Sequence, residues 1–292
     1  MLIPAMASLL AGAFPAMGAQ ASAYGVHGFN AQGQLVYRVV YELPGAKEDS
    51  LFTFVVVADA KGDPVREAAL ENDDQNRTNA AGQALVAQAE PRAAAEALVK
   101  DLPEPKPSEL DAVFTSSSGA KLSFSESERG GDCVLLATWT TPSRTVTGEI
   151  LRDRPPPHPA ATMALHACAE SKVSVAFRAD GARAALAWNL KDDVDPDRAH
   201  LAYVSPQDLA SIEILDAGAG KARVSEFSAA ATGAGFRVAL SAKARAKRTA
   251  SAVYARKGFE LEAAQVAKLA GADSVALLDW DSCCAIAVAL AK

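Results

Sequence analysis

The sequence is poor in the residues from which recognisable catalytic and metal-binding motifs are built. Only four histidines and four cysteines occur in 292 residues. The sequence contains no His-Glu-x-x-His zinc helix, no Gly-x-Ser-x-Gly nucleophile elbow and no Cys-x-x-Cys pair. These absences exclude the enzyme classes that such motifs mark, and we predict no cofactor.

Concentrated positive charge and long apolar runs are also scarce. The net charge is −6 and the basic residues are dispersed except over residues 243–248, so the electrostatic footprint of a nucleic-acid-binding protein is missing. After residue 23 no stretch approaches the ~18 apolar residues of a membrane-spanning helix. With 50% hydrophobic and 22% charged residues, the composition is that of a globular protein long enough for two domains. We expect no nucleic-acid partner and no membrane span in the mature protein.

Residues 1–23 form a segment without any charge that ends in Ala21-Ser22-Ala23. An apolar start followed by a small-x-small tripeptide is typical of a secretory signal peptide and its cleavage site. The alternative is a buried N-terminal helix, which Pro4, Pro15 and the glycines of this segment would interrupt. We therefore predict a signal peptide with cleavage near Ala23, and export to the periplasm or the extracellular space.

The four cysteines are Cys133, Cys168, Cys283 and Cys284. In an exported protein, a bridge between Cys133 and Cys168 is the favoured pairing because both fall in one predicted domain. On the chain-entropy model such a bridge would stabilise the fold by ~3 to 4 kcal/mol. We interpret Cys283 and Cys284 as small apolar residues that enter the last strand. The alternative for the first pair is a zinc site with His166, Cys168 and Cys133 as three ligands.

Residues 24–205 are predicted to form a β-rich N-terminal domain. Turn-forming residues 30–33 separate two β-rich runs and indicate a hairpin, and residues 51–58 are typical of a buried strand. A pattern of Phe, polar residues, Gly and strand recurs along this region as in the hairpins of β-propeller blades, but too few times for a propeller. We expect blade-like hairpins with a helical insertion near residues 79–100, followed by a Pro-rich extended segment.

Residues 209–292 are predicted to form a separate α/β domain in which a strand–helix–strand unit occurs twice. The first unit is expected to have a strand at 212–215, a helix through 224–231 that ends at 233–235, and a second strand after it. The second unit is expected to have a strand at 252–254, a helix at 259–270 and a strand at 285–290. Two such units give a four-stranded βαβ-βαβ sandwich, so the whole chain is of the α+β class. Because the last strand is apolar at every position, we place it in the interior of its sheet. We also expect residues 211–292 to fold by themselves.

Two loops of the C-terminal domain carry the candidate binding residues. Gly218, Gly220 and Lys221 lie between a predicted strand and a predicted helix, as in a phosphate-binding loop, although they match neither the dinucleotide fingerprint nor the Walker pattern. The second loop carries Lys243, Arg245, Lys247 and Arg248. Contact with an anion is the functional hypothesis for these seven residues. A tight packing turn and a solvated loop are the structural interpretations, which the sequence favours.

The C-terminal region contains four motifs in one order: Ile-Glu-Ile-Leu-Asp-Ala, Gly-Ala-Gly-Phe-Arg-Val, Thr-Ala-Ser-Ala-Val-Tyr and Ala-Ile-Ala-Val-Ala-Leu. Through them the chain from Ile212 onward resembles the C-terminal domain of LytR/CpsA/Psr cell-envelope proteins, which implies the α/β fold. Residues 24–205 sparsely resemble a family of predicted secreted bacterial proteins of unknown function, through Gly-Phe-Asn-Ala-Gln-Gly, Phe-Arg-Ala-Asp-Gly and Asp-Pro-Asp-Arg-Ala-His-Leu-Ala-Tyr-Val. That resemblance implies export and a β-rich fold.

These observations favour an exported, non-catalytic cell-envelope protein that binds or positions an envelope component. Its expected partner is a cell-wall or envelope polymer, or an envelope protein. The alternative is a secreted hydrolase or thiol enzyme whose catalytic residues lie far apart in the sequence.

Overall fold

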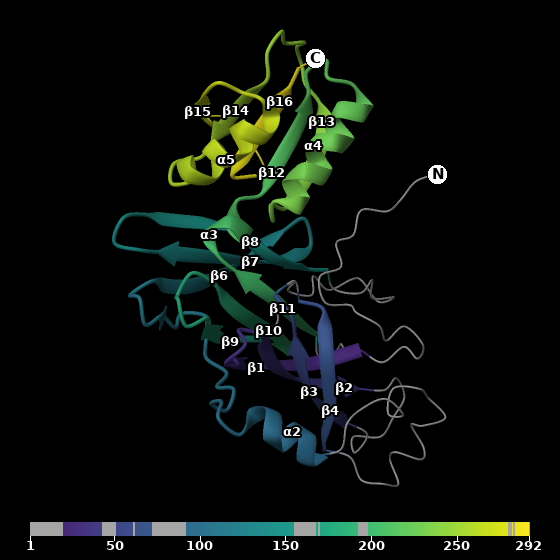
Figure 1. Cartoon of the computed structure of the whole chain (residues 1–292), viewed down its shortest axis with the longest axis vertical. Coiled ribbons are helices and arrows are strands. Elements are labelled where there is room, and N and C mark those ends of the chain that lie inside the picture. The colour runs from purple at the N-terminus through teal and green to yellow at the C-terminus, as the bar shows by residue number, and fades with distance from the viewer. Residues whose placement is uncertain are drawn as a thin grey trace.

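The protein is rich in β-strand, with several antiparallel sheets and few helices (Figure 1). The computed structural model describes residues 20–42, 51–60, 62–71, 92–154, 168, 170–191, 198–279, 282 and 284–291. None of the helices in these ranges is long and apolar enough to cross a membrane.

The first sheet is an antiparallel meander of four strands in the order β1-β2-β3-β4. Its strands are β1 (Gln20–Phe29), β2 (Leu35–Glu42), β3 (Leu51–Ala58) and β4 (Pro64–Glu71). The hairpin predicted at residues 30–33 is confirmed: Asn30 Oδ1 accepts hydrogen bonds from the amides of Gln32 and Gln34.

A helix covers the outer face of this sheet. Helix α2 (Arg92–Val99) buries Ala95 against an apolar cluster that includes Val36 and Val55. It is the C-terminal part of the helical insertion predicted near residues 79–100, whose first part, 79–91, lies outside the described residues.

The Pro-rich segment after α2 lies along β1. An ideal Cβ on Gly25 would come within 2.9 Å of Pro105 Cβ, so a larger residue at position 25 would push this segment away. His27 of β1 is buried, and its Nδ1 lies 3.1 Å from the carbonyl oxygen of Pro103. Ser108 then exchanges two backbone hydrogen bonds with Val173 of strand β9 (Glu170–Phe177). The extended segment therefore ties two sheets together at their edges.

The second sheet, β5-β6-β7-β8, and the third, β11-β10-β9, are also antiparallel meanders. The second contains β5 (Phe114–Thr115), β6 (Lys121–Arg129), β7 (Asp132–Thr140) and β8 (Thr145–Asp153). The third contains, besides β9, strands β10 (Ala184–Lys191) and β11 (Arg198–Val204).

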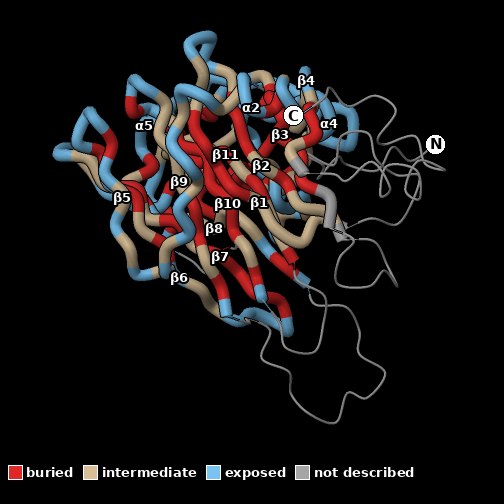
Figure 2. Tube along the Cα trace, turned by 90° about the horizontal axis from the view of Figure 1, so that it is seen from below, coloured by how far each residue is buried: buried red, intermediate tan, exposed pale blue. Residues whose placement is uncertain are grey.

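Strand β10 is buried on both of its faces, and Figure 2 shows it running through the interior of the molecule. Leu186 and Trp188 belong to the apolar core shared with the second sheet, whereas Ala185 and Ala187 belong to the core shared with the first sheet. Since successive side chains of a strand point to opposite faces, the three-stranded sheet lies between the two four-stranded sheets. The β-rich class is thus as predicted, and the hairpins pack as stacked sheets.

The chain passes through α3 (Pro206–Leu209) into an α/β region with a five-stranded sheet, in the order β13-β12-β16-β14-β15. Its elements are β12 (Ile212–Asp216), α4 (Lys221–Gly233), β13 (Val238–Lys243), β14 (Ala252–Ala255), α5 (Glu260–Ala270), β15 (Val275–Leu277) and β16 (Ile286–Leu290). Strand β12 is parallel to β13 and β16, and β14 is antiparallel to β16.

The interior strand of this sheet is the one predicted from the sequence, but the number of strands differs from the prediction. Strand β16 lies in the interior and is buried at all its positions, as predicted. The prediction of four strands is wrong because β15 adds a fifth at the edge. The sequence of this strand, Val-Ala-Leu, is apolar but has only three residues, and runs that mark a buried strand have about 4 to 8. Ala276 and Leu277 are exposed.

The α/β region contacts the β7–β8 hairpin through polar and apolar side chains. Arg144, between these strands, donates from Nη1 and Nη2 to the two carboxylate oxygens of Glu262 on α5, both at 2.7 Å. Arg237 donates to the backbone oxygen of Glu149 at 2.7 Å. One cluster of buried apolar residues also extends from the second sheet into the α/β region. Independent folding of residues 211–292 stays a prediction.

Candidate functional site

Three parallel strands of the α/β region end at the same edge of the sheet. Asp216, the last residue of β12, pairs with Lys243 of β13 on one side and with Leu290 of β16 on the other. The loop after β13 lies against the loop after β12, because the amides of Ala244 and Arg248 donate to the carbonyl oxygens of Asp216 and Ala217 at 2.9 and 2.8 Å. In open α/β sheets, this carboxyl edge is where ligands bind.

The basic side chains predicted to contact an anion gather at this edge, which we call the basic edge. Lys221 is the first residue of α4, directly after the first loop, and an ideal Cβ on Gly218 would lie 3.9 Å from Lys247 Cγ. Arg248 lies over the ring of Tyr254, 5.5 Å from its centre. The side chains of the basic edge are all exposed: Lys221, Lys243, Arg245, Lys247 and Arg248.

The two glycine amides of the first loop do not face an external ligand. Gly218 and Gly220 both donate to Oδ1 of Asp216, at 3.0 and 3.1 Å. Hydrogen bonds from the amides of Gly220 and Gly218 stabilise the ionised carboxylate, and they are the main reason that the pKa of Asp216 lies below its usual range. A carboxylate of the same loop accepts the hydrogen bonds of both amides, as expected of the tight packing turn that the sequence favours, and anion contact by this loop stays a prediction.

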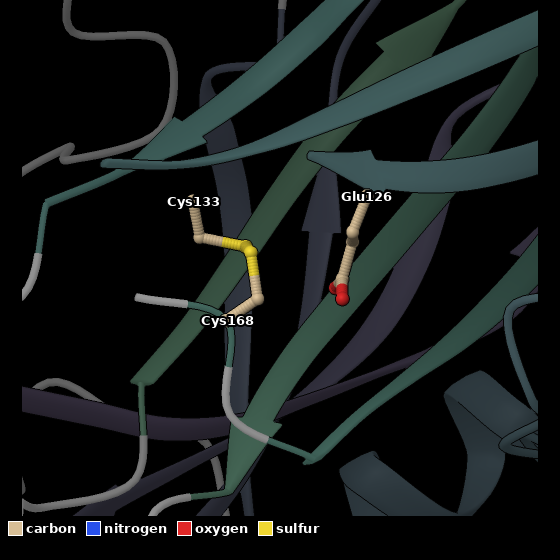
Figure 3. A group of neighbouring side chains, drawn as sticks. All are labelled: Glu126, Cys133 and Cys168. Atoms are coloured by element: carbon tan, nitrogen blue, oxygen red, sulfur yellow. A yellow bond between two sulfur atoms is a disulfide. The ribbon is translucent and has the colours of Figure 1, made fainter. Parts of the chain in front are cut away.

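A second group of polar side chains lies between the second and third sheets, around the disulfide. The structure joins Cys133 of β7 to Cys168, which precedes β9, with the Cα atoms 5.0 Å apart. This is the pairing predicted from the sequence. Cys133 is buried and Cys168 half-buried. The carboxylate of Glu126 on β6 lies beside the bond (Figure 3), with one oxygen within 4.8 Å of both sulfur atoms.

Two donors fix the Glu126 carboxylate. Nε1 of the buried Trp188 donates to Oε1 at 2.8 Å, and the hydroxyl of Ser171 donates to the same oxygen. Nothing in the sequence separates Glu126 from the other carboxylates of the chain. It becomes distinctive only because β6 and β10, far apart in sequence, face each other in the stacked sheets.

Trp188 also contacts an ion-paired group that the sequence did not reveal. Asp153 is 4% exposed and accepts from Nε of Arg198 at 2.8 Å through Oδ2, while its Oδ1 lies 2.7 Å from Nε2 of His200. The imidazole packs against the indole of Trp188, with ring centres 5.4 Å apart. Burial raises the pKa of Asp153, but His200 and Arg198 more than offset this and hold it below its usual range.

An aspartate that fixes one nitrogen of a histidine is an arrangement found in general bases. Among the residues that the structure describes, however, no hydroxyl or thiol hydrogen-bonds to His200. Within the described part of the chain, the enzyme alternative is supported by an oriented histidine but not by a nucleophile bonded to it.

The remaining sequence-based candidates are placed as follows. Cys284 is buried just before β16, in the position predicted for an apolar residue. Cys283 and His166 lie outside the described residues. Because Cys133 and Cys168 are joined to each other, the zinc site that they were to share with His166 does not exist in the disulfide form.

No protein-family model, curated protein or solved structure matches this chain. The resemblances to the LytR/CpsA/Psr C-terminal domain and to the secreted family therefore stay predictions.

Proposed function

We propose that this protein is an exported, non-catalytic component of the cell envelope that binds an anionic envelope polymer through the basic edge. One observation carries the proposal: basic side chains from two separate loops lie together, exposed, where three parallel strands end. Exposed lysines and arginines that follow one edge suit an extended polyanion, which can contact several of them at once. An acidic envelope protein is the second kind of partner that this charge would suit.

The disulfide supports the export part of the proposal. Disulfides persist in oxidising compartments such as the periplasm and the extracellular space, and they are rare where thiols are kept reduced. The bond links β7 to the chain before β9 across 35 residues. A disulfide that closes a loop of this length contributes about 3 to 4 kcal/mol in the chain-entropy model.

Reversing two charges of the basic edge tests the binding site. We expect Arg245→Glu/Lys247→Glu to weaken binding of long-chain inorganic polyphosphate, used as a model polyanion, by about tenfold or more at low salt. The estimate assumes that each exposed charge contributes roughly 1 kcal/mol at contact distance. The affinity of the parent protein should also fall as salt is added, because salt screens exposed charges.

The matched control is Lys100→Glu/Lys106→Glu, which changes the net charge equally but near α2, at the opposite end of the molecule from the α/β region (Figure 1). This control should bind polyphosphate nearly as the parent does. Equal weakening by both double variants would mean that only net charge matters and would refute the site.

The mature N-terminus tests export. We expect protein recovered from the envelope fraction to begin near Tyr24, as mass spectrometry of the intact chain would show. Cleavage there removes the first residues of β1 but keeps its anchor, because Asn189 donates to the Tyr24 carbonyl at 2.9 Å and accepts from its amide at 2.8 Å. Recovery of envelope protein that still carries Met1 would contradict the proposed signal peptide.

A further inference from the structure

Reduction of the disulfide would give two thiols next to a carboxylate, and these three groups can act as metal ligands. The three residues are Glu126, Cys133 and Cys168, whose ligand atoms all lie within 4.8 Å of one another. We propose that in the reduced protein these three residues bind a zinc ion. This inference is independent of the basic edge and of polymer binding.

The spacing of the ligand atoms suits a tetrahedral ion. Zinc binds thiolate sulfur at about 2.3 Å and carboxylate oxygen at about 2.0 to 2.2 Å, so its ligand atoms lie about 3.5 to 3.8 Å apart. Breaking the S–S bond lets the two sulfur atoms separate towards that distance, and the Glu126 oxygen is already within reach of both. Three protein ligands leave the fourth position for water.

The orientation of Glu126 favours the same role. Trp188 and Ser171 both donate to Oε1, and no hydrogen bond from a described residue reaches Oε2. The carboxylate is therefore fixed in place beside the two sulfur atoms. Donors that fix a ligating side chain in this way typically strengthen metal binding ~10 to 100-fold.

The redox and proton balance closes with an external reductant. A dithiol supplies two electrons and two protons and becomes a disulfide itself. A phosphine supplies the two electrons, and water supplies the two protons and the oxygen of the phosphine oxide. In both cases the S–S bond breaks and each sulfur becomes a thiol. Zinc then displaces the two thiol protons, so two thiolates and one carboxylate surround a divalent cation. Soft thiolates favour zinc over magnesium and calcium. The disulfide and the metal site exclude each other, because both use the same two sulfur atoms.

Cobalt(II) titration of the full chain tests the site, since cobalt replaces zinc and reports thiolate coordination by its absorption. All proteins carry Cys283→Ala/Cys284→Ala, which removes the other two cysteines. They are reduced with a phosphine without oxygen and freed of the reductant. We expect one equivalent of cobalt to give a thiolate-to-metal band and tetrahedral visible bands, which zinc abolishes. The oxidised protein should give neither.

Two glutamine variants on β6 assign the third ligand. Glu126→Gln keeps an acceptor for Trp188 and Ser171 but should weaken cobalt binding by about tenfold or more, in line with the loss of a ligand-shell group. Glu128→Gln, at an exposed position of the same strand, should bind as the parent does. Equal affinity of the Glu126 variant and the parent would overturn the assignment.

A thermal melt covers the case in which reduction loosens the fold. Because a ligand that binds only the folded state stabilises it, zinc should raise the melting temperature of the reduced parent, less so of the Glu126 variant, and not of the oxidised protein. A reduced chain that shows no cobalt band and no rise in melting temperature overturns the proposal, whether it is folded or not.

Discussion

Replacing Val288 by Asp is expected to lower the free energy of unfolding by about 4 kcal/mol or more, a large part of the stability of an ordinary domain. Val288 is fully buried in β16, where it pairs with Ile214 of β12 on one side and Val253 of β14 on the other. A carboxylate at this position would lie in a cluster of buried apolar residues and must either lose its hydration or be protonated. Urea denaturation followed by tryptophan fluorescence and circular dichroism would measure the loss.

Leu240→Asp is the matched control for this prediction. Leu240 lies on β13, at the edge of the same sheet, and is 44% exposed. The same carboxylate remains hydrated there, so we expect stability to change by less than about 0.5 kcal/mol. A Val288 variant as stable as the parent, or two variants with equal losses, would show that β16 is not the buried centre of this sheet.

Local sequence patterns were sufficient to predict the elements that are apolar throughout or bounded by strong turns. The run over residues 285–290 has no polar side chain, as expected of a strand covered on both faces and paired on both edges, and the structure places β16 in that environment. The turn at residues 30–33 was predictable for the same local reason, since Asn30 satisfies two amides of its own loop.

Local sequence patterns could not predict how strands far apart in the sequence pack against each other. Strand β10 is sandwiched between two sheets, but its sequence, Ala-Ala-Leu-Ala-Trp-Asn-Leu-Lys, is also compatible with a strand that has one exposed face, because alanine is common in both settings. Strand β15 forms only because β14 offers a free edge next to it. Both features are consequences of tertiary structure.

Some residues of the candidate sites could be predicted from the sequence, and others become neighbours only in the folded protein. The Cys133–Cys168 pair was predicted from export and from the shared predicted domain. The basic residues of the second loop are close together in the sequence. Glu126 and His200, by contrast, both contact Trp188, and they do so only through strand register and sheet stacking. The role of Asp216 depended on loop geometry, since its carboxylate occupies the amides that were proposed for an anion.

The second large effect is expected from Asp153→Asn. Asp153 lies between Arg198 and His200, and its side chain is only 4% exposed. The substitution preserves the size of the side chain and one acceptor but removes the charge that the buried guanidinium faces. Breaking a buried ion pair from one side costs about 3 to 5 kcal/mol, and we expect a loss near the lower end because the amide oxygen still accepts one hydrogen bond. Denaturant unfolding at pH 7 would measure it.

The pH dependence separates this electrostatic loss from a packing defect. Because the pKa of Asp153 is lower in the folded protein than in the unfolded chain, its contribution is present above the unfolded value, about 3.9, and is lost as the pH falls through the folded value. The stability gap between parent and Asp153→Asn should therefore be widest at neutral pH and narrow below about pH 4, where the parent carboxyl is itself protonated. Asp180→Asn, which removes an equally arginine-paired but exposed carboxylate, should leave stability almost unchanged at every pH. A stability difference between parent and Asp153→Asn that stays constant down to pH 2 would show that Asp153 stabilises the fold through the shape of its side chain. It would contradict the proposed role of its charge.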